Sequence, residues 1–532
     1  MRRVYKYMLA ALVAVAVSGC IENDIPYPVI KLDILSFEAE GLKSPAVINP
    51  TEQRVSLELL ETTDPRRVSV TGVSVSEGAH SDVSFPGLFD MRAPLYVTLS
   101  MYQEYEWVVS ATQHIERYFH VEGQIGDSEI DVVNHIATAY VPMDTDMNNI
   151  KVTAIKLGPE EVTSYTPDPF SFTSYENTVH NVTVSYYGDI EEMWTLRVIP
   201  TEVEVEFTAV DAWAKRIWVY AMGRSDADLG FKYRPTGTEE WLPVNEITID
   251  GGNFSACIEG LEPLTSYDVV AFSGENFTNV ETVTTEDTFT LLNAGFEDWS
   301  IYDGCYYPYA EGATPFWGTG NDGAKIASTT LTEPIEDVRP GSTGRYAASL
   351  QSKKAAVMGI GKFAAGNLFV GAFGGLSGMD GLVHFGRPCT ARPVALRGWV
   401  KYNCGAIDEI GRVPSTRPDI KKGEHDEGQI FIAVGDWTAA QYGGTDECPV
   451  EINTKDESTF FNRFGPNVIG SGELLFDSST DGWVEFTVPL EYFSTSRIPT
   501  HIIVVFTSSR YGDYFTGSTG SSMRVDDIEL VY

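Results

Sequence analysis

The sequence has little cysteine, a shortage of basic residues and no long apolar segment beyond its N-terminal region. Six cysteines occur in 532 residues, and none forms a C-x-x-C pair or a zinc-ligand spacing, so no zinc site is indicated. Asp and Glu number 75 against 37 Lys and Arg, a net charge of −38, which argues against nucleic acid as a partner. No G-x-S-x-G, H-E-x-x-H or dinucleotide-binding motif occurs, which removes several enzyme classes.

The first nineteen residues indicate an export signal. Basic residues precede an apolar run from Met8 to Val17, which is too short to span a bilayer, and the small residues Ser18 and Gly19 follow. This order is typical of a secretory signal peptide, here residues 1–19.

A lipid anchor is expected directly after this signal. Residues 17–20 read V-S-G-C and resemble a bacterial lipobox, which implies cleavage before Cys20 and lipidation of that residue. Glu22 and Asp24 follow and resemble the surface-export signal of Bacteroidetes lipoproteins. We therefore expect a lipid-anchored outer-membrane protein at the cell surface, with residues 20–29 as a proline-containing tether.

Short strands separated by Asp, Asn, Gly and Pro recur after this tether, with almost no helical periodicity. The pattern predicts an all-β protein made of tandem sandwiches. The expected parts are an immunoglobulin-like sandwich at 30–114, a second at 115–201, a fibronectin type III-like domain at 202–286 and one large sandwich at 287–532.

Two sequence features support the first three parts. A spacing of Phe, Gly and Ile recurs in the first two, and each copy ends on a tryptophan strand, at Trp107 and Trp194. In the third, residues 261–267 read L-E-P-L-T-S-Y and resemble the fibronectin type III tyrosine corner, in which the hydroxyl of Tyr267 would bond to backbone a few residues upstream.

Aromatic residues in the large sandwich are candidates for binding a sugar, because a ring stacks on the C–H face of a sugar while nearby polar groups bind its hydroxyls. One group lies on a single face of the strand at 396–402, and the others lie in loops or at a strand end. The alternative is that each tryptophan packs beneath its own loop. The candidates are Trp317, Asn321, Arg397, Trp399, Lys401 and Trp437.

Residues 361–373 read G-K-F-A-A-G-N-L-F-V-G-A-F, with glycine where β-pairing would favour branched side chains. Glycine within a strand marks a bulge or a close approach to the backbone by another chain segment or a ligand. The segment is therefore expected to be a bulged strand that lines a pocket, or else a corner where strands change sheets.

The C-terminal sequence resembles the putative carbohydrate metabolism domain of Bacteroidetes lipoproteins across essentially all of 287–532. The resemblance implies a β-jelly-roll, a glycan-binding pocket and no established reaction. It rests on W-G-T-G-N at 317–321, the glycine-rich segment to Gly371, F-G-R-P at 385–388, R-P at 392–393, W-V-K-Y at 399–402, S-S-R-Y-G-D-Y-F-T-G at 508–517, G-S at 520–521 and V-D-D-I at 525–528.

Metal binding and catalysis are further hypotheses for this domain. Its ends resemble those of carbohydrate-binding jelly rolls that hold structural calcium, which would place Glu297 and the inward-facing Asp526 at such an ion. A backbone N–H or an arginine would serve Asp526 equally well. A glycosidase would require two carboxyl groups, and the candidates without a recognised motif are Asp426, Glu427, Glu485 and Asp513.

The resulting hypothesis is a surface lipoprotein that captures a polysaccharide or oligosaccharide, together with other glycan-uptake proteins. A glycoside hydrolase or lyase that uses a carboxylate pair is the first alternative. An adhesive or structural envelope protein, with exposed edge strands and no aromatic pocket, is the second.

Overall fold

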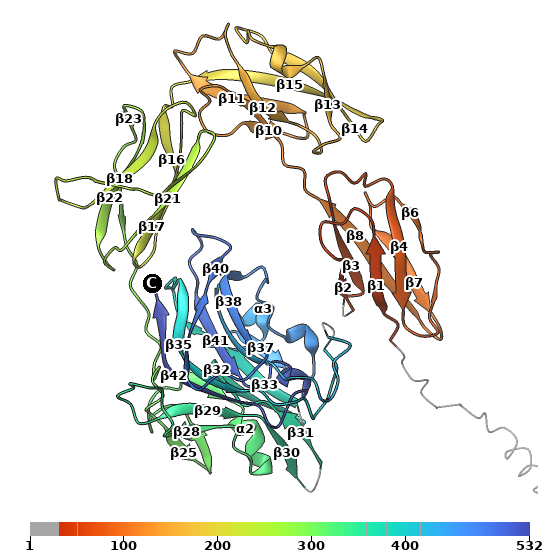
Figure 1. Ribbon diagram of the computed structural model, residues 1–532, viewed down its shortest axis with the longest axis vertical. Coiled ribbons are helices and arrows are strands. Elements are labelled where there is room, and N and C mark those ends of the chain that lie inside the picture. Colours follow the sequence, from red (N-terminus) through yellow and green to blue (C-terminus); the bar gives the residue numbers. More distant parts are fainter. Residues whose placement is uncertain (1–30, 51, 358–359, 379, 415–416) are drawn as a thin grey trace, which may run out of the picture. The chain divides into compact units, whose positions relative to one another are not determined.

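The computed structural model describes residues 31–50, 52–357, 360–378, 380–414 and 417–532 (Figure 1). The predicted signal peptide at 1–19, the lipidation site Cys20 and the tether at 20–29 lie outside the described residues. Within them the chain is almost entirely β-structure, which confirms the predicted fold class. No helix in this described part is long and apolar enough to cross a membrane. The short helices are η1 (Pro169–Ser171), α2 (Asn321–Ala324), η2 (Lys325–Ala327), α3 (Ala439–Tyr442), η3 (Glu457–Thr459) and η4 (Gly512–Tyr514).

Two compact units make up the chain: one extends to residue 115 and includes 159–162, and the other contains 116–158 and 163–532. The first unit is a sandwich of a three-stranded and a five-stranded sheet around the fully buried Trp107. Its strands are β1 (Ile34–Ala39), β2 (Val47–Asn49), β3 (Arg54–Leu59), β4 (Val68–Val75), β5 (His80–Ser81), β6 (Gly87–Phe89), β7 (Leu95–Ser100) and β8 (Glu104–Gln113).

The second unit begins with another sandwich, whose core surrounds Trp194. In the first sandwich β3 pairs in parallel with the tryptophan strand β8, and here β11 pairs in parallel with the tryptophan strand β15. Gly41 and Gly123 also share positive φ angles of 75° and 73°, so the sequence repeat corresponds to a repeated local structure. The strands are β9 (Tyr118–Val121), β10 (Glu129–Asp131), β11 (Ile136–Pro142), β12 (Val152–Lys156), β13 (Ser164–Thr166), β14 (His180–Tyr186) and β15 (Ile190–Thr201).

A third sandwich follows, with a four-stranded and a five-stranded sheet. The Tyr267 hydroxyl accepts a hydrogen bond from the backbone N–H of Glu262 at 3.0 Å, so the expected tyrosine corner is present. The strands are β16 (Val205–Ala212), β17 (Arg216–Gly223), β18 (Leu229–Pro235), β19 (Leu242–Pro243), β20 (Ile247–Asp250), β21 (Asn253–Glu259), β22 (Ser266–Ser273), β23 (Asn276–Phe277) and β24 (Glu281–Thr284).

The C-terminal domain packs a nine-stranded sheet against a five-stranded sheet of order β28-β29-β42-β35-β39. The larger sheet runs β37-β33-β32-β41-β36-β38-β40, with β27 paired to β32 and β34 paired to β41. The strands are β25 (Ser300–Tyr302), β26 (Cys305–Tyr307), β27 (Trp317–Thr319), β28 (Thr332–Ile335), β29 (Ala347–Gln351), β30 (Lys353–Val357), β31 (Ile360–Ala364), β32 (Asn367–Ser377), β33 (Asp380–Phe385), β34 (Arg387–Pro388), β35 (Ala395–Asn403), β36 (Gly428–Gly435), β37 (Val450–Asn453), β38 (Val468–Phe476), β39 (Val484–Pro489), β40 (Glu491–Tyr492), β41 (His501–Thr507) and β42 (Ser522–Val531).

Strand β41 lies in the middle of the larger sheet, between β32 and β36 (Figure 1). All seven of its residues are buried. Ile502, Val504 and Phe506 pack into the core between the two sheets, whereas Ile503 and Val505 pack on the opposite face. The sequence I-I-V-V-F, apolar at every position, therefore corresponds to a strand covered on both faces. The second face of this sheet is the one that carries the pocket described below.

A buried arginine joins the third sandwich to the C-terminal domain. Arg392 is 3% exposed, and its guanidinium makes two hydrogen bonds to Glu286, at 3.2 and 2.8 Å, and one to the Ala212 carbonyl at 2.7 Å. The guanidinium also donates to the Thr495 carbonyl and lies 5.0 Å from the ring centroid of Trp213. These two parts of the second unit therefore share a polar contact centred on a buried guanidinium.

Candidate functional site

A pocket of about 800 Å³ opens on the outer face of the nine-stranded sheet. Its floor comes from neighbouring strands, and its walls come from segments 320–327, 362–365, 454–464 and 510–515. Eleven of the lining side chains are Phe or Tyr. The size and the aromatic lining are those of a small-molecule site rather than of a packing defect.

Strand register arranges the floor as two rows of side chains. In one row Phe369 on β32 lies opposite Val505 on β41, which lies opposite Phe431 on β36. In the next row Asn367 lies opposite Thr507, and Thr507 lies opposite Gln429. Because side chains two residues apart in a strand point to the same face, the floor places an apolar row beside a row of amides and a hydroxyl.

The glycines of 361–373 are explained by close backbone approach. The segment forms two strands, β31 and β32, separated at residues 365–366. A Cβ at Gly366 would lie 2.3 Å from the backbone N of Gln351, and one at Gly371 would lie 2.2 Å from the carbonyl oxygen of His384. A register shift follows Phe373, and Phe363, Phe369 and Phe373 all line the pocket. The segment is thus a bulged, pocket-lining strand that is also broken at a corner.

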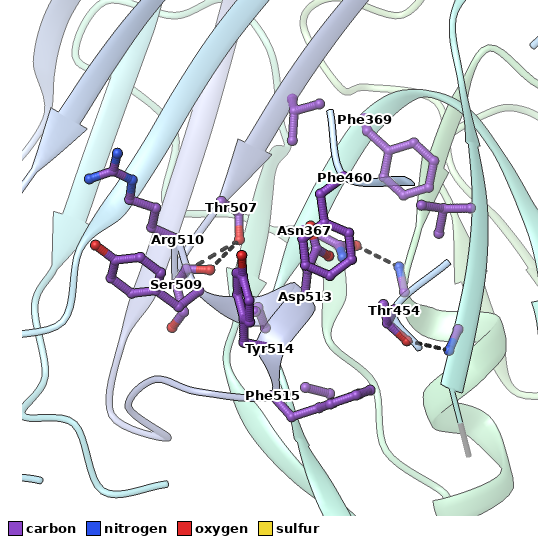
Figure 2. Close-up of a pocket in the computed structure, with 18 of the residues that line it drawn as sticks. Asn367, Phe369, Thr454, Phe460, Thr507, Ser509, Arg510, Asp513, Tyr514 and Phe515 are labelled. Carbon is purple, nitrogen blue, oxygen red and sulfur yellow. Dashed lines mark hydrogen bonds between the residues drawn. The ribbon is translucent and has the colours of Figure 1, made fainter. Parts of the chain in front are cut away.

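Asp513 is a carboxyl of the pocket lining that has no partner among the described residues. It belongs to η4, lines the pocket, and forms no hydrogen bond or ion pair through its carboxylate with any residue that the structure describes. Figure 2 shows it among the rings of Phe460, Tyr514 and Phe515. Burial raises the pKa of Asp513 to about 6, against the opposing charge of Arg412. A carboxyl with this environment in a pocket is a candidate for contact with a ligand.

The other charged side chains of the pocket are already paired. Lys362 lies 2.7 Å from Asp380, and Arg510 lies 2.8 Å from Glu427. Arg463 contacts Glu473 at 2.5 Å, and the second oxygen of Glu473 accepts a hydrogen bond from Gln429, also at 2.5 Å. Each cation that lines the pocket therefore has its charge neutralised by a carboxylate.

Arg412 supports the aromatic wall from behind. Its guanidinium donates to the carbonyls of Thr454 and Asp513. It also lies 5.9, 5.7 and 6.0 Å from the ring centroids of Phe460, Tyr514 and Phe515. One side chain thus connects the wall segments 454–464 and 510–515, and its attraction to the three rings helps to hold them in place.

Of the four carboxyls named from sequence as glycosidase candidates, only Asp513 lines the pocket. Asp426 is fully buried, where it accepts hydrogen bonds from Ser509, Ser521 and the backbone N–H of Ser518. Glu427 is paired with Arg510, and Glu485 lies opposite Trp399 on the smaller sheet.

Three of the predicted sugar-binding residues are part of the core. Trp317 is 1% exposed and donates to the carbonyl of Leu292 at 2.7 Å. Both polar atoms of the buried Asn321 amide are fully used in hydrogen bonds to backbone groups of 306, 331 and 332. Trp437 is 2% exposed and packs edge-on against Phe461. All three side chains are buried, with Trp317 in the core between the two sheets and Trp437 in the cluster on the opposite face of the larger sheet.

The other three predicted residues lie together, as strand parity required, but on β35 of the smaller sheet and away from the pocket. Arg397 pairs with Glu529, and Lys401 pairs with Asp337. The guanidinium of Arg339 lies 5.5 Å from the ring centroid of Trp399. Sugar binding by this group stays a prediction, and the pocket is the stronger candidate.

The proposed calcium ligands have other partners. Glu297 accepts hydrogen bonds from the backbone N–H groups of Arg345 and Tyr346, and Asp526 accepts one from that of Arg339. In the described residues no group of three His, Cys, Asp or Glu side chains is placed to hold a metal. The second oxygen of Asp526, Oδ1, is buried and has no hydrogen-bond partner among the described residues, so calcium binding by Glu297 and Asp526 stays a prediction. The backbone N–H that the sequence left as the alternative is the observed partner of Asp526.

Sequence reasoning missed most of the pocket walls. The segments F-F-N-R-F at 460–464 and Y-G-D-Y-F at 511–515 each combine three aromatic residues with one or two polar or charged ones, and this density was a usable signal. The proximity of the two segments could not be read from the sequence, because they are about fifty residues apart in the chain and only the fold brings them together.

Fold and site together define an all-β protein whose C-terminal jelly roll bears an aromatic pocket with a small set of polar groups. Residues 295–531 match the family model described as "Putative carbohydrate metabolism domain". The C-terminal part of the chain thus matches a carbohydrate-related family model, in agreement with the resemblance seen in the sequence.

Comparison with solved structures gives distant likenesses. One is a "putative glycoside hydrolase" from Bacteroides thetaiotaomicron, with 16% identity, a TM-score of 0.31, and coverage of 95% of this chain and 98% of that chain. Another is a "putative glycoside hydrolase" from Bacteroides vulgatus, with 21% identity, a TM-score of 0.33, and coverage of 44% and 96%. Among curated proteins, none matches the sequence significantly.

Proposed function

We propose that the pocket on the nine-stranded sheet binds a polysaccharide or oligosaccharide. The observation that carries this proposal is the lining, where the half-buried rings of Phe460, Tyr514 and Phe515 on the walls share the pocket with the half-buried amides of Asn367 and Gln429 on the floor. A sugar ring has an apolar C–H face and a rim of hydroxyls, and it requires both kinds of contact. The carbohydrate-related family of the domain supports the same function.

A glycan array probed with the purified full-length protein tests this proposal. Phe460 is a half-buried wall residue whose ring lies 5.0 Å from that of Tyr514. Replacing it with alanine removes ring contact with a ligand, and we expect affinity to fall by ~10-fold or more. Trp399→Ala, on the other sheet, is the matched control and should leave binding unchanged. Equal loss in both variants, or loss only in Trp399→Ala, would move the site to β35.

Cleavage of the bound glycan is a second candidate function, and Asp513 is the observation that favours it. A glycosidase requires a carboxyl that can donate a proton to the leaving oxygen, and burial holds the pKa of Asp513 near the range suited to this task. Product analysis of every retained glycan separates the two functions. Products that disappear in Asp513→Asn would establish an enzyme, whereas intact ligand would establish a binding protein.

We also propose that the protein is held at the outer-membrane surface by lipid on Cys20, where it would act with other glycan-uptake proteins. The proposal rests on the sequence around Cys20. Fatty-acid labelling of the wild type and of Cys20→Ala, followed by protease treatment of intact cells, tests it. Unlabelled wild-type protein would refute the anchor, and labelled protein that resists protease would refute the surface location.

A further inference from the structure

The cations that line the pocket all have carboxylate partners. Lys362, Arg463 and Arg510 are the cations that line it, and carboxylates lie 2.7, 2.5 and 2.8 Å from them. These cations therefore offer little attraction to a second anion. Arg412, behind the wall, donates through its terminal nitrogens to backbone carbonyls, its Nε has no hydrogen-bond partner among the described residues, and its charge partly opposes the rise in the pKa of Asp513.

Asp513 differs from these cations. The carboxylate of Asp513 has no hydrogen bond or ion pair among the described residues, although it lines the pocket. In Figure 2 it lies among aromatic rings, while the guanidinium of Arg510 points away from it. An anionic ligand would meet this carboxylate at short range, in a region of low dielectric where repulsion between like charges is strong.

We infer that the pocket selects uncharged glycans and rejects those that carry uronic acid or sulfate groups, and that Asp513 accepts hydrogen bonds from the hydroxyls of the bound sugar. The inference rests on the proposed function, since it names the class of glycan for that same pocket. A carboxylate suits this role because it accepts hydrogen bonds at two oxygens and so can bind two hydroxyls of one sugar ring.

The net charge of −38 would also repel polyanions from the whole surface. The test must therefore separate repulsion of anions within the pocket from repulsion by the rest of the protein surface. Glu427→Gln removes the partner of Arg510 at the pocket wall. Glu529→Gln removes the partner of Arg397 on the outer face of the other sheet. Both substitutions raise the net charge by one, and only the first frees a cation that lines the pocket.

The experiment measures affinities of the full-length protein for neutral oligosaccharides from xylan, mannan, galactan and β-glucan, and for anionic ones from polygalacturonate, alginate and chondroitin sulfate. We expect neutral ligands to be retained and anionic ones to bind at least ~10-fold more weakly. Asp513→Asn should weaken neutral binding by ~10-fold or more. Glu427→Gln should increase the affinity for anionic ligands, and Glu529→Gln should not.

Each outcome bears on a different statement. Retention of anionic oligosaccharides as tightly as neutral ones overturns the inference but leaves the proposed function intact. Equal effects of Glu427→Gln and Glu529→Gln would also overturn it, because the selection would then belong to the whole surface. Unchanged neutral binding in Asp513→Asn refutes the assigned role of that carboxylate. Retention of no glycan overturns the proposed function together with the inference.

Discussion

Removing the Arg392 side chain should strongly destabilise the contact between the third sandwich and the C-terminal domain. The residue is 3% exposed and its partner Glu286 is 21% exposed at its side chain. In Arg392→Met the methionine would fill most of the space, but the carboxylate of Glu286 and the carbonyl of Ala212 would lose this donor, while the carbonyl of Thr495 would keep only the indole N–H of Trp213. Leaving one partner of a buried ion pair uncompensated costs about 3–5 kcal/mol.

Calorimetry of the full-length protein can measure this loss. For parts of this size, about 3 kcal/mol corresponds to a fall of roughly 6–12 °C in the melting temperature of the transition that contains them. Arg397→Met is the control, because Arg397 and Glu529 are 46% and 55% exposed, and an exposed pair contributes about 1 kcal/mol at most.

The double variant Arg392→Met with Glu286→Gln should recover part of the loss, since no unpaired charge remains. A shift below about 2 °C for Arg392→Met, or one no larger than that of Arg397→Met, would refute the assignment of Arg392 as a buried ion pair.

Two further predictions concern pH. Glycan affinity should fall as pH drops through about 6, because burial raises the pKa of Asp513 to about 6 and protonation removes the charged acceptor. Titration calorimetry from pH 5 to 8 checks this. The affinity of Asp513→Asn should not change over the same range. Burial likewise raises the pKa of Asp526 to about 6, so stability should be lost as pH rises from about 4 to 6. At pH 7, Asp526→Asn should therefore have a higher free energy of unfolding than wild type, by up to about 3 kcal/mol, as measured by denaturant unfolding. If the difference in free energy of unfolding between the two proteins were the same at pH 4, this reasoning would be contradicted.

The sandwich architecture could be predicted because it depends on local sequence. Alternating strands, the repeated tryptophan strands and the tyrosine corner each involve residues close together in the chain, and the apolar run of β41 indicates burial on both faces without knowledge of its neighbours. The face shared by Arg397, Trp399 and Lys401 follows from the two-residue period of a strand.

The site could not be predicted in the same way. Trp317 and Asn321 lie among turn-forming residues, which suggests an exposed loop, yet the Trp317 indole and the Asn321 amide bond to distant backbone groups and are buried. The pocket itself depends on strand register and on Arg412, which contacts segments some forty and one hundred residues further along the chain. Such proximity is a property of the tertiary fold rather than of any local pattern.

The contact made by Arg392 also bears on how the C-terminal domain can be isolated. A fragment that begins at residue 287, where sequence composition changes, would lack Glu286, Ala212 and Trp213. Arg392 would then be a solvent-facing cation without its carboxylate, and Tyr492, which packs 4.4 Å from the ring of Trp213, would lose its cover. Dissection of this protein should therefore keep the third sandwich attached to the jelly roll, as a two-domain fragment.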